Sequence, residues 1–85
     1  MGVFEEIEER LRVAFSPREL EISDESEIHR GHAGYREGGE SHFRVRIAAE
    51  TFASMSRIAR HRAVHDALGK ELVGRIHALA LEIRP

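Results

Sequence analysis

"HFRVRIA", residues 42–48, decides how this 85-residue chain folds. Phe43, Val45 and Ile47 alternate with polar or charged residues, and successive side chains of a strand point to opposite faces. The pattern predicts a strand with one face on a core and the other toward solvent. "ELEIS", residues 19–23, alternates in the same way and predicts a second half-buried strand.

The segments before and after these two strands have a helical period. Residues 2–15 predict an amphipathic helix, which Pro17 ends because proline cannot continue it. From Phe52 to Leu72 the helical period returns, and Gly69 predicts a break into two shorter helices. Residues 75–84 alternate again and predict a third strand. The predicted buried face of the second helical region carries Ile58, Val64, Leu68 and Leu72.

The predicted order is therefore αββααβ. Three strands with the helices on one face indicate an α+β two-layer sandwich. The third strand fits beside either of the first two, so the pattern leaves the sheet order open. With no linker or repeat, and a length near the lower limit for one core, residues 1–85 are expected to form a single domain.

The composition excludes several classes of protein. The chain has no cysteine, which excludes disulfides and thiolate metal sites. A hydrophobic content of 41% and a charged content of 33% are typical of a globular protein and not of a disordered one. No signal peptide or membrane-spanning run is present, which favours a cytoplasmic protein without membrane attachment. No nucleophile–base arrangement, P-loop or dinucleotide fingerprint is present, so an enzyme is not expected.

Six histidines are the most conspicuous candidates for chemistry. Three lie in "HRGHAGYREGGESH", residues 29–42, in a connection longer than the roughly 2–5 residues of most hairpin loops. His29 and His32 alone do not make a zinc site, which needs about four fixed ligands. Their spacing favours solvent-exposed loop histidines, with metal ligation as the alternative. His42 and His65 are expected at exposed or rim positions.

The two remaining histidines lie in apolar patterns. His77 has the same parity as the leucines of the last strand, which predicts a core or sheet-edge histidine with hydrogen-bonded nitrogens. His61 lies near the centre of the apolar stripe of the second helical region and is predicted to be packed. Both readings are structural rather than chemical.

"RIARHR", residues 57–62, places Arg57, Arg60 and Arg62 on one helix. Such side chains near a helix–turn–helix-like break can lie along phosphates. The alternative, which the pattern favours, is an ordinary solvated face. Arg44 and Arg46 are expected to add to the positive patch, while the net charge of -2 argues against nucleic-acid binding.

Four motifs together resemble one family. "DESEIH", "GESHFRVRI", "RHRAVHDAL" and "IHALAL" occur in the order and rough spacing of the BolA family. The resemblance implies a fold like that of the class II KH domain. It also implies a monothiol glutaredoxin as partner and a bridging [2Fe-2S] cluster, shared with glutaredoxin and glutathione, with no cofactor when the protein is alone. The BolA side would contribute histidine ligands.

The resemblance assigns these ligands residue by residue. The histidine of the "HAL" motif is His77. The loop ligand is His29 when counted from "DES" and His32 when the run "HRGHAG" is aligned, and counting from the other side does not decide between them. His61, in the "RHR" motif, would organise the fold or the partner surface.

These features favour an accessory protein in iron–sulfur cluster assembly, trafficking or iron regulation, a monomer or weak homodimer when alone. The alternative is a DNA-binding transcriptional regulator that uses the helix–turn–helix-like segment 57–68. A third reading is an adaptor that binds only protein.

Overall fold

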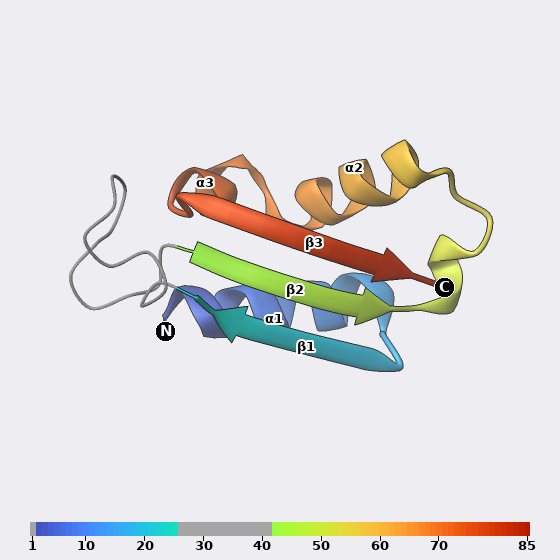
Figure 1. The fold of residues 1–85 in the computed structure, drawn as a ribbon, viewed down its shortest axis with the longest axis horizontal. Coiled ribbons are helices and arrows are strands. Elements are labelled where there is room, and N and C mark those ends of the chain that lie inside the picture. The colour runs from blue at the N-terminus through green and yellow to red at the C-terminus, as the bar shows by residue number, and fades with distance from the viewer. Residues whose placement is uncertain (1, 26–41) are drawn as a thin grey trace.

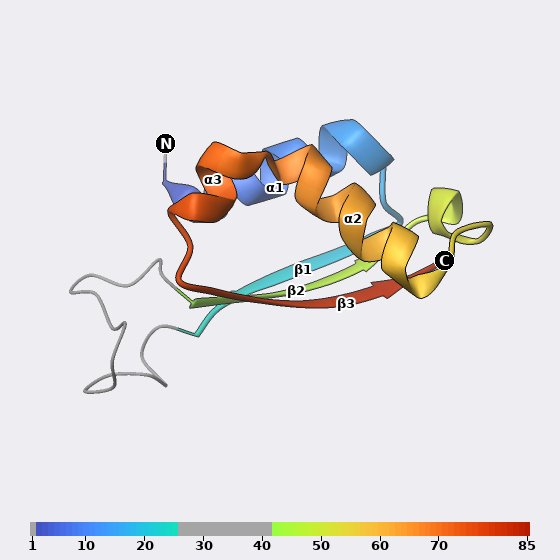
Figure 2. The same cartoon turned by 90° about the horizontal axis from the view of Figure 1, so that it is seen from above.

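The computed structural model describes residues 2–25 and 42–85 and confirms the α+β class. All helices lie on one face of a three-stranded sheet, as Figures 1 and 2 show from two directions. No helix in these two ranges is long and apolar enough to cross a membrane. The elements are α1 (Val3–Phe15), β1 (Glu19–Asp24), β2 (His42–Ala48), the 3₁₀ helix η2 (Glu50–Phe52), α2 (Arg57–Leu68), α3 (Lys70–Gly74) and β3 (Ala78–Arg84).

The sheet order is β1-β2-β3, so the third strand lies beside the second. β1 pairs with β2 antiparallel, and β3 pairs with β2 parallel. A parallel pair needs a crossover connection, which η2, α2 and α3 provide across the covered face of the sheet. The alternation in each strand could not decide this order, because a strand with one buried face fits equally well beside either neighbour.

The core lies between the sheet and the helices. Phe43, Val45 and Ile47 of β2 are at most 2% exposed, as their alternation predicts. The aromatic rings of Phe15 and Phe52 pack with centroids 4.8 Å apart and close the end of the core near η2. The helical side of the core contributes Ile7, Leu11, Val64, Leu68 and Leu72, none of which is exposed.

The helix ends follow local sequence signals. α1 ends at Phe15, because Ser16 adopts a left-handed conformation with φ 44° and donates its N–H to the carbonyl of Arg12 before Pro17. α2 begins at Arg57, later than the predicted Phe52, since the Ser56 side chain caps it by accepting from the N–H of Ala59.

Ile58 is 69% exposed, so its predicted place on the buried face of α2 is wrong. At 100° per residue, Ile58 lies about 120° around the helix from the buried Val64. The first turn of α2 also projects beyond the edge of β3, where no sheet lies beneath it (Figure 1). The predicted break at Gly69 is confirmed between α2 and α3.

Candidate functional site

One end of the sheet gathers segments that are far apart in the sequence. Because β1 runs antiparallel and β3 parallel to β2, β1 ends where β2 and β3 begin (Figure 1). The N–H of Glu25 donates to the carbonyl of His42 at 2.7 Å, so the two residues that flank segment 26–41 lie together. His77 immediately precedes Ala78, which is opposite His42 in the sheet. The topology therefore places His77 beside both flanks of the segment that contains the predicted loop ligands.

His29 and His32, the candidate loop ligands, lie outside the described residues. The choice between them stays a prediction. What the structure contributes is the position of Glu25 and His42, at the same end of the sheet as His77.

The imidazole rings of His42 and His77 are neighbours, with centroids 5.0 Å apart and planes inclined at 57°. His77 is exposed, whereas His42 is only 3% exposed. The prediction that His42 is an exposed or rim residue is therefore wrong. Alternation within β2 predicts which side of the sheet His42 faces, but it does not reveal the ring that the neighbouring chain segment places against it.

The expectation that His77 is a core or sheet-edge histidine with hydrogen-bonded nitrogens is also wrong, because His77 is exposed and precedes the first residue of β3. The N–H groups of Arg75 and Ile76 donate to carbonyls of α3, so the chain is still in the turn after that helix, and β3 begins only at Ala78. The alternation of β3 therefore does not extend back to His77. Its ring forms no hydrogen bond with any residue that the structure describes, and a ligand or partner can reach it.

The described residues hold no complete metal site. Within residues 2–25 and 42–85, no group of three or more histidine, aspartate or glutamate side chains is arranged to bind a metal ion. The exposed imidazole of His77 can supply a single nitrogen, and neutral imidazole is a good ligand for iron, copper and zinc. His77 therefore fits one position of a site that other donors would complete.

Arg75 ties the turn before His77 to the first helix. Its Nη1 and Nη2 donate to the two carboxylate oxygens of Glu6, at 3.0 and 2.8 Å. Its Nε lies 2.7 Å from a carboxylate oxygen of Glu71. Two parallel hydrogen bonds between a guanidinium and a carboxylate fix orientation as well as distance. The turn that presents His77 is thus held against α1.

This ion pair predicts a loss of stability in acid. The hydrogen bond from Arg75 holds the pKa of Glu6 below its usual value of 4.5, against the opposing effect of desolvation. A carboxyl group with a lowered pKa stabilises the fold above its unfolded-state pKa, and that stability is lost as the pH falls through the folded-state pKa. We expect the free energy of unfolding, measured by urea denaturation below pH 4.5, to decrease more in the wild type than in Glu6→Gln. Glu9→Gln, an exposed position on the same helix, should respond as the wild type does, and an equal response of Glu6→Gln would contradict this role.

The three arginines of α2 do not form a uniform basic surface. Arg57 and Arg62 are exposed, whereas Arg60 is half-buried and donates from Nε to the carbonyl of Phe52 at 2.9 Å. Arg60 therefore holds η2 against the start of α2. None of the three forms an ion pair with another described residue, so their charges are not neutralised. His61 is half-buried between them, in line with its predicted packing.

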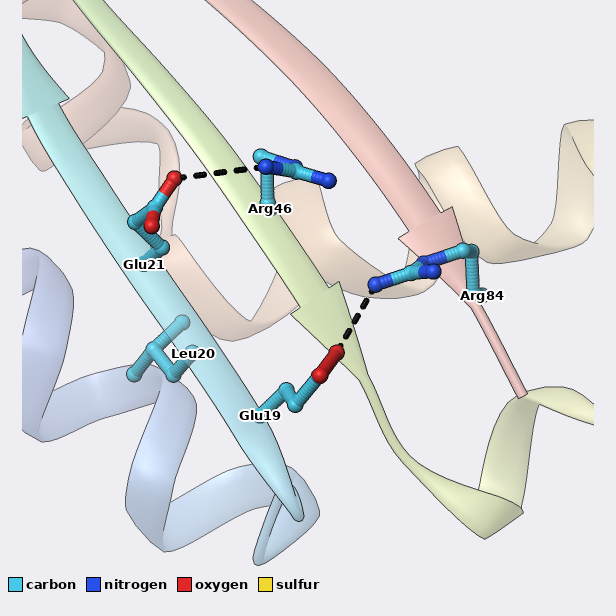
Figure 3. A pocket seen from close by; sticks show the side chains of 5 residues that line it. All are labelled: Glu19, Leu20, Glu21, Arg46 and Arg84. Atoms are coloured by element: carbon cyan, nitrogen blue, oxygen red, sulfur yellow. Dashed lines mark hydrogen bonds and ion pairs between the residues drawn. The ribbon is translucent and has the colours of Figure 1, made fainter.

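The open face of the sheet carries a ladder of paired charges. Arg46 on the central strand lies 3.5 Å from Glu21 on β1 and 3.0 Å from Glu82 on β3. The hydrogen bond from Arg46 to Glu82 raises the pKa of Arg46. Arg84 lies 2.8 Å from Glu19, and Figure 3 shows Arg84 facing Glu19 and Arg46 facing Glu21 across the strands. The hollow between them, about 220 Å³, is therefore lined mainly by charges that neutralise one another.

Arg44 is neutralised in the same way, since its Nε lies 3.1 Å from a carboxylate oxygen of Glu25. The prediction that Arg44 and Arg46 extend the positive patch of α2 is therefore wrong. Strand alternation showed that both arginines face outward. It could not identify their carboxylate partners, because alternation does not give the register between strands. These partners are Glu21 of β1, Glu82 of β3 and Glu25 just after β1.

With this geometry described, the chain can be compared with known proteins. The family model described as "BolA-like protein" matches residues 11–85, which is most of the chain and includes all three strands. The chain belongs to the BolA-like protein family. The motifs that suggested the family, from "DESEIH" at residues 24–29 to "IHALAL" at residues 76–81, all lie within the matched range.

Relatives of this BolA-like chain have been named in bacteria and in animals. The DNA-binding transcriptional regulator BolA of Escherichia coli K12 is 43% identical over 81 residues, covering 95% of this chain and 73% of that protein. BolA-like protein 1 of Mus musculus is 45% identical over 78 residues. The match covers 92% of this chain but only 54% of the mouse protein. This chain therefore spans about half of the mouse protein. These names describe a regulator and a BolA-like protein rather than an enzyme.

Solved structures agree with the BolA-like assignment. The BolA domain of SufE1 from Arabidopsis thaliana has a TM-score of 0.79 at 37% identity, covering 96% of this chain and 91% of that one. The solution structure of BolA1 from Mus musculus has a TM-score of 0.75 at 39% identity, covering 98% of this chain and 65% of that one. The three-stranded mixed sheet with its helices is thus the fold of a BolA domain.

Proposed function

We propose that this protein is an accessory factor in iron–sulfur cluster assembly, trafficking or iron regulation, and that it acts as a heterodimer with a monothiol glutaredoxin. The two proteins would share a bridging [2Fe-2S] cluster. His77 provides one ligand of this chain, and His29 or His32 provides the other. A cysteine of the glutaredoxin and glutathione complete the set.

The observation that supports this proposal is the position of His77. Its imidazole is exposed at the end of the sheet, beside Glu25 and His42, which flank the histidine-containing segment. A ligand to a group shared with a partner must be accessible, and a buried histidine could not serve. Arg75, held by Glu6 and Glu71, orients the turn from which His77 projects.

The absence of cysteine gives the proposed site its chemistry. Because this chain has no cysteine, it can offer a cluster no thiolate, and histidine nitrogens are its donors of choice for iron. Neutral imidazole in place of thiolate removes negative charge, which raises the reduction potential of a cluster, as in Rieske centres. Because protons compete with metal for an imidazole nitrogen, binding through His77 should weaken as the pH falls.

Anaerobic reconstitution of the cluster in a mixture of this protein and a monothiol glutaredoxin tests the proposal. With iron and sulfide, the wild type should give a visible circular dichroism spectrum that differs from that of glutaredoxin alone. His77→Ala should change that spectrum, because one metal–nitrogen bond is lost. His29→Ala and His32→Ala in the same assay should distinguish the two loop candidates, since only the true ligand changes the spectrum.

His65→Ala is the matched control, because His65 is an exposed histidine on α2 and no part of the proposed site. It should leave the spectrum as in the wild type. If His77→Ala also gives the wild-type spectrum, His77 is not a ligand and the proposal fails at its central residue. Iron and sulfide analysis of the purified heterodimer separates cluster sharing from an adaptor that binds only protein.

A second candidate function is DNA-binding transcriptional regulation. It is favoured by the name of the Escherichia coli relative and by the unneutralised charges of Arg57 and Arg62 on α2. The net charge of -2 and the paired charges of the open sheet face weigh against it.

A gel-shift assay across a range of salt concentrations tests this second function. If DNA lies along α2, Arg62→Ala should weaken binding to duplexes of unrelated sequence alike and reduce the salt dependence by about one released counterion. Arg60 is unsuitable for this test because it holds the carbonyl of Phe52. Lack of binding by the wild type even at low salt would remove the DNA-binding hypothesis.

A further inference from the structure

A groove runs between the outer edge of β3 and the start of α2. β3 is an edge strand of the described sheet, with β2 on one side only, and α2 projects beyond its other side (Figures 1 and 2). The groove has a volume of about 410 Å³. Met55, Arg57, Arg60 and His61 line one wall, and Leu81 and Ile83 of β3 line the other.

The backbone of β3 is oriented for pairing along this groove. The carbonyl of Arg84 accepts from the N–H of Ala49 at 3.1 Å, on the side of β2. Because a strand repeats every two residues, the N–H and C=O groups of Leu81 and Ile83 point to the opposite side, which is the free edge. An edge of this kind is a template for another extended chain, with main-chain hydrogen bonds for affinity and side-chain contacts for specificity.

The side chains around this edge combine apolar surface with positive charge. Leu81 and Ile83 are only half-buried, so apolar surface remains at the groove. Arg57 is exposed in the first turn of α2, where the helix dipole disfavours a cation, and no described carboxylate pairs with it. Glu82, the acidic residue of this wall, is held by Arg46 at 3.0 Å. The fold itself therefore gains nothing electrostatic from Arg57, whereas an acidic ligand would.

We infer that this groove binds an extended acidic peptide segment of a partner protein. The segment adds a fourth strand at β3. On the face that α2 covers, its apolar side chains contact Leu81 and Ile83, and its carboxylates lie toward Arg57. Duplex DNA fits these features less well, because it has no main chain to pair with a strand edge and no use for an apolar wall. The groove lies along the second half of β3, whereas His77 precedes its first residue, so the inference does not depend on the proposed cluster site.

The probe for the test is a short synthetic peptide that repeats valine, serine, glutamate and serine, titrated into the ¹⁵N-labelled protein. Because successive side chains of a strand point to opposite faces, valine and glutamate share the face toward Leu81, Ile83 and Arg57, and we call it the valine–glutamate peptide. We expect saturable shifts of the amide signals of Leu81 and Ile83, with slower hydrogen exchange of both amides. The same peptide with lysine in place of glutamate should not bind. The valine–glutamate peptide N-methylated at every residue should also fail, since neither of its edges can donate to β3.

Charge reversal on α2 separates the groove from general electrostatic attraction. Arg57→Glu should weaken binding of the valine–glutamate peptide about tenfold, which corresponds to the loss of one favourable charge contact and its replacement by repulsion. Arg62→Glu makes the same change of charge on the same helix, but Arg62 does not line the groove, so affinity should stay near the wild type. The amide spectra of both variants establish that they remain folded.

Four outcomes would overturn the inference. In the first three, the acidic peptide gives no saturable shifts, the lysine peptide binds equally well, or Arg62→Glu weakens binding as much as Arg57→Glu does. In the fourth outcome, a DNA duplex shifts the amide signals of Leu81 and Ile83 while the acidic peptide does not. The groove is then a nucleic-acid binding site. If Arg57→Glu gives the wild-type visible circular dichroism spectrum when it is reconstituted with glutaredoxin, peptide binding at the groove is separate from the function of His77.

Discussion

Leu11→Ala should lower the free energy of unfolding by about 3–5 kcal/mol, as removal of a large side chain from a packed core does. Leu11 is fully buried in the interior of α1, at the centre of the layer that faces the sheet. At roughly 0.05–0.15 kcal/mol per residue, a chain of this length has a total stability of about 4–13 kcal/mol. The single change thus removes a large part of the total.

Val13→Ala is the matched control, since Val13 lies on the same helix but is 81% exposed. It should change the free energy of unfolding by no more than about 0.5 kcal/mol. Urea denaturation followed by circular dichroism at 222 nm measures both variants. Thermal melts should show the midpoint of Leu11→Ala lowered by at least about 12 °C, at roughly 4–8 °C per kcal/mol for a small domain. Similar losses in the two variants would mean that α1 does not pack as described.

The elements of this fold could be predicted because their signals are local. The bounds of β2 coincide with the predicted strand at residues 42–48, since alternation of apolar and charged residues depends only on neighbours in the chain. The end of α1 and the break at Gly69 follow from single residues with restricted or permissive backbones. The place of β3 could not be predicted, because it depends on which edge of β2 the crossover helices cover.

The candidate site was only partly accessible to sequence reasoning. The sequence motif identified His77 as a candidate ligand, but parity predicted a core or sheet-edge position for its side chain, because the start of β3 was predicted a few residues too early. His42 was expected at an exposed or rim position for a different reason, since the ring of His77 that lies against it comes from a distant part of the chain. A one-residue change in where a strand begins alters the side chain's environment, and strand ends are set by turns such as the one Arg75 holds.

The groove at β3 was not predicted, because its walls belong to different elements. The arginines of α2 were visible in the sequence, whereas their position beside the edge of β3 follows from the start of α2 at Arg57 and from the sheet order. The sequence also gave no sign that Arg60 is occupied by the carbonyl of Phe52 while Arg57 is available. Residue types indicated which side chains could bind a ligand. Only the fold shows which of two similar residues has a structural role and which is available for binding.

The junction between α2 and α3 depends on a glycine. Gly69 has φ 86° and ψ 152°, a region that residues with a Cβ atom rarely adopt. A Cβ atom there would also lie 3.2 Å from Nη1 of Arg10, tighter than an ordinary contact. That same nitrogen donates to the carbonyl of Leu68, the last residue of α2, and Arg10 lies 3.7 Å from Glu6. The glycine thus permits both the turn and the contact that ties α1 to the end of α2.

Gly69→Ala should therefore lower the free energy of unfolding by about 1–3 kcal/mol from backbone strain, and further if Arg10 is displaced. Gly74→Ala is the matched control, because no atom lies within 4 Å of a Cβ added there and its φ is not positive. Since alanine restricts the unfolded chain more than glycine, Gly74→Ala should be neutral or stabilising by up to about 1 kcal/mol. Urea denaturation of the two variants should thus give changes of opposite sign or clearly different size. Equal effects would mean that the left-handed backbone at residue 69 is not what limits substitution, and that the α2–α3 junction relaxes to accept a side chain.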